Sequence, residues 1–107
     1  MTPLIGRARL EQLLSGAGSR RIAVVGDAML DVYLRGDVDR ISPEAPVPVH
    51  RVRDRVLALG GAANVAQNAA AIGCVTELVA VVGNDPAARQ LEELLVTRGC
   101  ETRGLVA

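Results

Sequence analysis

The 107-residue sequence contains a single aromatic residue, Tyr33, and has neither phenylalanine nor tryptophan. Because half of the residues are nevertheless hydrophobic, a core must be built from valine, leucine, isoleucine and alanine. Those residues are the usual filling of a parallel sheet covered by helices. The composition therefore favours an α/β protein, and the length fits one small domain or a portion of a larger one.

The sequence also contains no lysine and has no net charge. All twelve basic residues are arginine, and twelve acidic residues balance them. A neutral chain without a basic stripe gives no support for nucleic-acid binding. A phosphate bound by this chain would have to be held by arginine side chains or by backbone N–H groups.

Metal-binding cysteine motifs and membrane-length apolar runs are lacking as well. Cys74 and Cys100 lie far apart and match no metal or redox spacing, so we expect reduced thiols. The first residues alternate apolar and charged side chains too often for a signal peptide, and no apolar run reaches the length of a membrane span. The sequence thus predicts a soluble, cytoplasmic protein.

The remaining pattern predicts alternating helices and strands. The continuous apolar run Ile22 to Val25 is typical of a central parallel strand buried on both faces. Asp85 followed by Pro86 is typical of a helix start, with Asp85 as the cap. Helices are predicted over residues 7–15, 62–72 and 86–98, and strands over residues 22–25 and 76–82, with a further extended segment after residue 99.

The stretch from residue 28 to residue 59 interrupts this order. Apolar and polar residues alternate only in part, and three prolines, at positions 43, 46 and 48, remove backbone donors. We expect two to four short antiparallel strands here, forming a flap apart from the main sheet. The few parallel strands elsewhere need cover on both faces, so the chain is expected to be the N-terminal portion of a larger α/β protein.

Two acidic residues stand just past the first predicted strand. Asp27 and Asp31 follow its carboxyl end, which is where ligands bind in open α/β sheets. The pair is suited to accepting hydrogen bonds from a polyol or to contributing a metal ligand, whereas a turn residue and a solvated side chain are the alternative. No G-x-G-x-x-G follows the strand, which counts against a dinucleotide site.

The segment LGGAANVAQN, residues 59–68, is the second candidate site. Gly60 and Gly61 allow unusual backbone angles and close approach of a ligand, and Asn64 offers a donor and an acceptor. The N–H groups at the start of the following helix would favour an electronegative oxygen. A glycine turn that lets the helix pack closely explains the same residues equally well.

Together these segments resemble the ribokinase-like (PfkB-type) carbohydrate kinases. A strand ending in glycine, an aspartate and a β lid come first, and GGAANVA at 60–66 is then followed by Gly73 and Gly83 at the family's spacing. The resemblance implies the N-terminal part of a parallel-sheet sandwich with an inserted antiparallel lid. Residues 1–20 would be a leading helix and connector, residues 21–31 and 60–107 the α/β core, and residues 32–59 the lid.

The resemblance also implies roles for individual residues. Asp31 and Asn64 would bind sugar hydroxyls, Gly60 and Gly61 would bring backbone against the sugar, and Asp27 would have a lesser part. The family's catalytic Asp and its ATP and Mg²⁺ sites belong to a later region, so no catalytic, cofactor-binding or metal-binding residue is expected here. The 107 residues alone are expected to be inactive, and the lid is expected to form a homodimer.

A narrower resemblance concerns residues 26–52, GDAMLDVYLRGDVDRISPEAPVPVHRV. They are similar to the family members that phosphorylate D-glycero-D-manno-heptose 7-phosphate and are often fused to a nucleotidyltransferase domain. This implies transfer of the ATP γ-phosphate to the anomeric hydroxyl, giving a 1,7-bisphosphate for ADP-heptose and lipopolysaccharide core synthesis. A kinase for another sugar or a nucleoside, and a truncated product that only binds or dimerises, remain the alternatives.

Overall fold

The chain alternates helices and strands in the order expected from the sequence. The computed structural model describes residues 4–107, apart from the side chains of residues 39, 50 and 51. Its helices are α1 (Arg7–Ser15), α2 (Ala62–Ile72) and α3 (Pro86–Thr97), with a short 3₁₀ turn at Ala17–Ser19. Its strands are β1 (Arg21–Val25), β2 (Ala28–Ile41), β3 (Pro48–Gly61), β4 (Val75–Val81) and β5 (Glu101–Val106).

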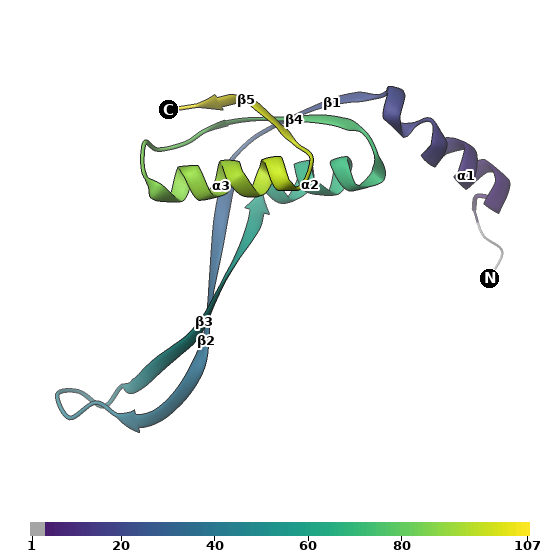
Figure 1. Cartoon of the computed structure of the whole chain (residues 1–107). Coiled ribbons are helices and arrows are strands. Elements are labelled where there is room, and N and C mark those ends of the chain that lie inside the picture. The colour runs from purple at the N-terminus through teal and green to yellow at the C-terminus, as the bar shows by residue number, and fades with distance from the viewer. Residues whose placement is uncertain (1–3) are drawn as a thin grey trace.

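Strands β1, β4 and β5 form a parallel sheet, and β2 and β3 form a separate antiparallel pair (Figure 1). The order in the parallel sheet is β1-β4-β5, with α3 making the crossover from β4 to β5. The antiparallel pair projects from the body as a long hairpin. The fold is therefore the expected α/β arrangement, with the hairpin as the inserted lid.

The core lies between one face of the parallel sheet and helices α2 and α3. Leu78 of β4 and Leu95 of α3 are completely buried, and so are Ala63 and Ala66 of α2. The two alanines bring the α2 backbone close to the strands, because no long side chain separates them. The core is thus assembled from aliphatic side chains, as the shortage of aromatic residues predicts.

The position of β1 differs from the prediction. The run from Ile22 to Val25 was expected to be central and buried on both faces, but β1 lies at an edge of the three-stranded sheet. β4 is the central strand, and Val25 is 74% exposed. Continuous apolar character is typical of a strand covered on both faces, and here the described helices α2 and α3 cover one face only.

The helix ends follow the local signals in the sequence. Asp85 caps α3, since its Oδ1 accepts a hydrogen bond of 2.8 Å from the backbone N–H of Ala88, and Pro86 is the first helical residue. Gly73 ends α2 in the left-handed region with φ of 110°. Among the described residues no helix is long and apolar enough to cross a membrane.

The lid also differs from the prediction. It consists of two antiparallel strands, within the expected two to four, but each strand has 14 residues instead of being short, and the pair runs from Ala28 to Gly61. Pro43 and Pro46 lie in the connecting loop and Pro48 starts β3, so no proline interrupts the ladder. Polar residues along the strands are tolerated because most of the hairpin stands clear of the core, with both faces exposed.

Candidate functional site

The candidate residues gather where four elements meet. β1 ends at Val25 and β2 begins at Ala28, so Asp27 lies in the short link between them. β3 ends at Gly61 and α2 begins with the next residue. The exit of the parallel strand, the base of the lid and the amino end of α2 are therefore joined within a few residues of chain.

Asp31 and Gly60 are in direct contact across the lid. Gly60 pairs with Met29 and Asp31 pairs with Ala58, so Asp31 and Gly60 are diagonal neighbours on one face of the hairpin. A Cβ atom built on Gly60 would lie 2.6 Å from Oδ2 of Asp31, closer than real Cβ contacts allow. The missing side chain of Gly60 thus provides the space that the Asp31 carboxylate occupies.

Gly61 has a different role, because its backbone conformation requires glycine. Its φ is 58° and its ψ is −134°, a region that residues with a side chain rarely adopt. A Cβ atom there would meet the backbone carbonyl oxygen of Asp27 and the Cε atom of Met29. That same Asp27 carbonyl accepts a hydrogen bond of 2.8 Å from the N–H of Ala62, the first residue of α2. Gly61 therefore permits the sharp change of direction that fixes the start of the helix.

Asn64 lies in the first turn of α2, and the structure already uses one of its groups. Its Oδ1 accepts a hydrogen bond of 2.7 Å from Nε2 of Gln67. Its amide nitrogen has no partner among the described residues and is exposed. Asn64 therefore offers a donor to a ligand, whereas Asp31 offers acceptors.

The five predicted residues are brought together only in part. Asp31 touches Gly60, and Asp27 reaches Gly61 through its backbone carbonyl. The Asp27 carboxylate is exposed and makes no side-chain hydrogen bond within the described part of the chain, and Asn64 binds Gln67 rather than any of the other four. Sequence reasoning missed Met29, which shares the Asp31 face and contacts the glycine pair. The period-two alternation of a strand would have identified it.

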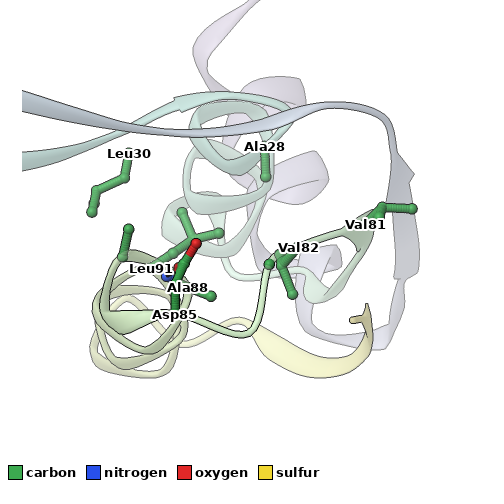
Figure 2. Close-up of a pocket in the computed structure, with 9 residues that line it drawn as sticks. Ala28, Leu30, Val81, Val82, Asp85, Ala88 and Leu91 are labelled. Carbon is green, nitrogen blue, oxygen red and sulfur yellow. Dashed lines mark hydrogen bonds between the residues drawn. The ribbon is translucent and has the colours of Figure 1, made fainter.

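A separate pocket lies on the other side of β2. Figure 2 shows Ala28 and Leu30 of β2 facing Val82, Ala88 and Leu91, and the cavity volume is about 200 Å³. Asp85 is the one charged residue among the lining residues, and its carboxylate is engaged in capping α3. The one charged side chain of this pocket is thus already engaged, whereas the Asp31 carboxylate is exposed and makes no hydrogen bond within the described residues, so we assign the candidate site to the Asp31 face.

The described residues do not fit a site for a metal ion bound to a nucleotide. No group of three or more histidine, cysteine, aspartate or glutamate side chains in residues 4–107, residues 39, 50 and 51 aside, is placed to hold a metal ion. Mg²⁺ in phosphoryl-transfer sites is held by carboxylates and phosphate oxygens. The candidate residues of the lid and of α2 instead offer a carboxylate, an amide donor and backbone N–H groups, which are groups suited to binding hydroxyls.

A family model for the pfkB family carbohydrate kinases matches residues 19–107. The chain belongs to this family. The matched region contains every element from β1 onward, including the lid and the glycine pair. The family match therefore includes the whole junction described above.

Curated relatives within the family include enzymes named for heptose. The chain is 55% identical over 82 residues to the D-beta-D-heptose 7-phosphate kinase of Bordetella bronchiseptica, covering 77% of this chain and 26% of that protein. It is 56% identical over 79 residues to the bifunctional protein HldE of Alkalilimnicola ehrlichii, covering 74% and 17%. The chain thus spans about a quarter or less of the length of these relatives.

Solved sugar kinases share the fold. The fructokinase of Xylella fastidiosa is 26% identical with a TM-score of 0.61, over 80% of this chain and 24% of that one. An uncharacterized sugar kinase from Pyrococcus horikoshii, solved in complex with ATP, is 30% identical with a TM-score of 0.54, over 78% and 25%. The parallel sheet and the antiparallel lid of this chain therefore both match the fold of these sugar kinases.

Replacing Gly61 by alanine is expected to destabilise the protein. With φ of 58° and ψ of −134°, the backbone lies in a sparsely populated region that costs a residue with a side chain about 1–3 kcal/mol, and the added Cβ would also meet the Asp27 carbonyl. We expect thermal unfolding of the complete protein to shift to lower temperature.

Gly18→Ala is the matched control, because its new Cβ would lie 3.9 Å from the carbonyl oxygen of Gly73, an ordinary contact. Equal melting temperatures for the two variants would contradict the role given to Gly61.

Proposed function

We propose that the complete protein carrying this chain transfers the γ-phosphate of ATP to the anomeric hydroxyl of D-glycero-D-manno-heptose 7-phosphate. The product would be heptose 1,7-bisphosphate, an intermediate for ADP-heptose and the lipopolysaccharide core. The observation that carries the proposal is the Asp31 carboxylate held over Gly60 at the base of the lid. The choice of heptose is supported by the 55% identity to a heptose 7-phosphate kinase over 77% of the chain.

In this proposal the chain supplies the acceptor side of the active site. Asp31 accepts hydrogen bonds from sugar hydroxyls, and the exposed amide nitrogen of Asn64 donates one. The amino end of α2 favours an electronegative oxygen of the sugar beside Gly61. The lid closes over the sugar and keeps out water, which otherwise competes as the phosphoryl acceptor.

The rest of the chemistry is proposed to lie outside residues 1–107. ATP supplies the transferred phosphoryl group, and Mg²⁺ together with a catalytic Asp would act from the later region. Since in-line transfer needs both sides of the site, we propose that the 107 residues alone do not catalyse it. We also propose that the enzyme is cytoplasmic and that it carries a fused nucleotidyltransferase domain, which the similarity to a relative named as a bifunctional protein supports.

A kinase for another sugar is the second candidate function. The structural similarity to a fructokinase favours it, because the same fold there serves a different carbohydrate. The residues that contact hydroxyls do not by themselves select one sugar, since a carboxylate and an amide fit many polyols.

Substrate choice is tested with the complete protein, ATP and Mg²⁺ against a panel of acceptors. We expect heptose 7-phosphate to be used with a kcat/KM at least about a hundredfold above that for fructose, fructose 6-phosphate or ribose, a difference of ~2.7 kcal/mol. The product is identified by phosphorus NMR as a 1,7-bisphosphate. Comparable values for fructose 6-phosphate or ribose would overturn the assignment to heptose.

Substituting Asn64 by aspartate separates sugar binding from folding. The carboxylate still accepts the hydrogen bond from Gln67, and a negative charge in the first turn of a helix is stabilising by about 0.3–1 kcal/mol. The donor toward the sugar is lost, so we expect the KM for the sugar to rise about tenfold while the melting temperature holds or increases.

Asn68→Asp is the control, since it makes the same change one turn further along α2. A sugar KM that is unchanged by Asn64→Asp, or raised equally by both substitutions, would refute the role of Asn64.

We further propose that the lid forms a homodimer with the lid of a second copy. Its face opposite Asp31 exposes two apolar side chains, since Val32 is 43% and Leu34 is 51% exposed; Leu57 pairs with Val32, and Arg55 pairs with Leu34. Nearer the body the same face packs into the core through Leu59. An apolar sheet face left exposed on a long hairpin is a ready contact for an identical hairpin.

Leu34→Asp tests this interface in the complete protein. A charge on the apolar face would be buried without a partner, so we expect the dimer dissociation constant to rise at least about tenfold in analytical ultracentrifugation. Val96→Asp, on the exposed side of α3, should leave the assembly unchanged. A wild-type protein that is monomeric at micromolar concentration would rule out the dimer.

A further inference from the structure

The face of the lid that carries Asp31 continues outward to the chain's single aromatic residue. Tyr33 is the second residue after Asp31, so both side chains lie on the same face of β2, with their Cα atoms about 7 Å apart. Across the lid, Tyr33 pairs with Val56 as Asp31 pairs with Ala58. The first shift in register comes only after Arg35, so this face is continuous from Asp31 to Tyr33.

Tyr33 is exposed and takes no part in the core. Its side chain is 55% exposed, and that of Val56 opposite it is 37% exposed. The core cluster instead takes Leu30 and Leu59, which lie on the other face of the same strands. Packing among the described residues therefore does not explain why the one aromatic residue of the sequence stands here.

Charged residues flank Tyr33 on the Asp31 face of the lid. Arg35 pairs with Asp54 in the next row outward, and Asp31 lies in the next row inward. The opposite face carries Val32 and Leu34, with Arg55 across from Leu34. Charged neighbours beside an aromatic ring fit a ligand with both hydroxyl groups and C–H groups better than they fit an apolar protein surface.

We propose that Tyr33, with Val56 beside it, is the surface on which the C–H face of the acceptor sugar rests while Asp31 holds its hydroxyls. Tyrosine suits this place because its ring is rigid and apolar and its hydroxyl remains in a polar setting. The proposal rests on the proposed sugar-kinase function and adds a specificity-determining contact to it. It makes the lid a part of sugar recognition as well as a cover.

The test compares Tyr33→Ala and Tyr33→Phe in the complete kinase. We expect Tyr33→Ala to raise the KM for heptose 7-phosphate about tenfold and to leave the KM for ATP within about twofold, because only the sugar contact is removed. Tyr33→Phe keeps the ring and should stay within about twofold of wild type. Calorimetric titration of the sugar without ATP should show the same order of affinities.

Ile41→Ala is the control, because it truncates an exposed apolar side chain at the far end of the same strand. It should leave the KM for the sugar unchanged. Melting temperatures of all variants should match that of wild type, since Tyr33 lies outside the core.

Three results would overturn the proposal: an unchanged sugar affinity in Tyr33→Ala, an equal rise of the KM values for sugar and ATP, or a loss in Tyr33→Phe as large as that in Tyr33→Ala. A failure of the proposed function would be detected separately, in the panel of acceptor sugars measured with the wild-type protein. If that protein prefers another sugar, the heptose assignment falls, and the same variants measured with the preferred sugar still decide the role of Tyr33.

Discussion

The hydrogen bond from the N–H of Ala62 to the backbone carbonyl of Asp27 fixes the geometry on which the site depends. It ties the start of α2 to the link between β1 and β2, and Gly61 permits it by taking a positive φ. The lid strands are thereby held at their base while their outer parts stand free. In the function proposed above, this fixed base anchors the lid that covers the sugar and excludes water.

Much of the fold was predictable because its signals are local. Asp85 and Pro86 mark the start of α3, and Gly73 marks the end of α2, through capping and backbone preferences that do not depend on the rest of the chain. The place of β1 at the edge was not predictable, since the order of strands depends on which segments pair. The length of the lid strands was missed for a related reason. The interrupted alternation of apolar and polar residues predicted short strands, whereas an exposed hairpin tolerates polar residues on both faces of long strands.

The sequence named candidate residues for the site, and the structure adds how those residues are arranged. The family resemblance pointed to Asp31 and the glycine pair, yet only the β2–β3 register shows that the Asp31 carboxylate occupies the space over Gly60. The hydrogen bond from Gln67 to Asn64 likewise depends on side-chain rotamers. Contacts of this kind follow from tertiary geometry, which neither composition nor spacing specifies.

The glycine pair joins the two explanations that the sequence left open, a packing turn and a ligand cradle. Gly61 is required by the backbone, which is a packing reason. Gly60 is required by the position of a carboxylate, and that carboxylate is exposed and not otherwise engaged within the described chain. Gly60 thus leaves room for a carboxylate that no described side chain engages, and in the proposed function this carboxylate is the acceptor offered to the sugar hydroxyls.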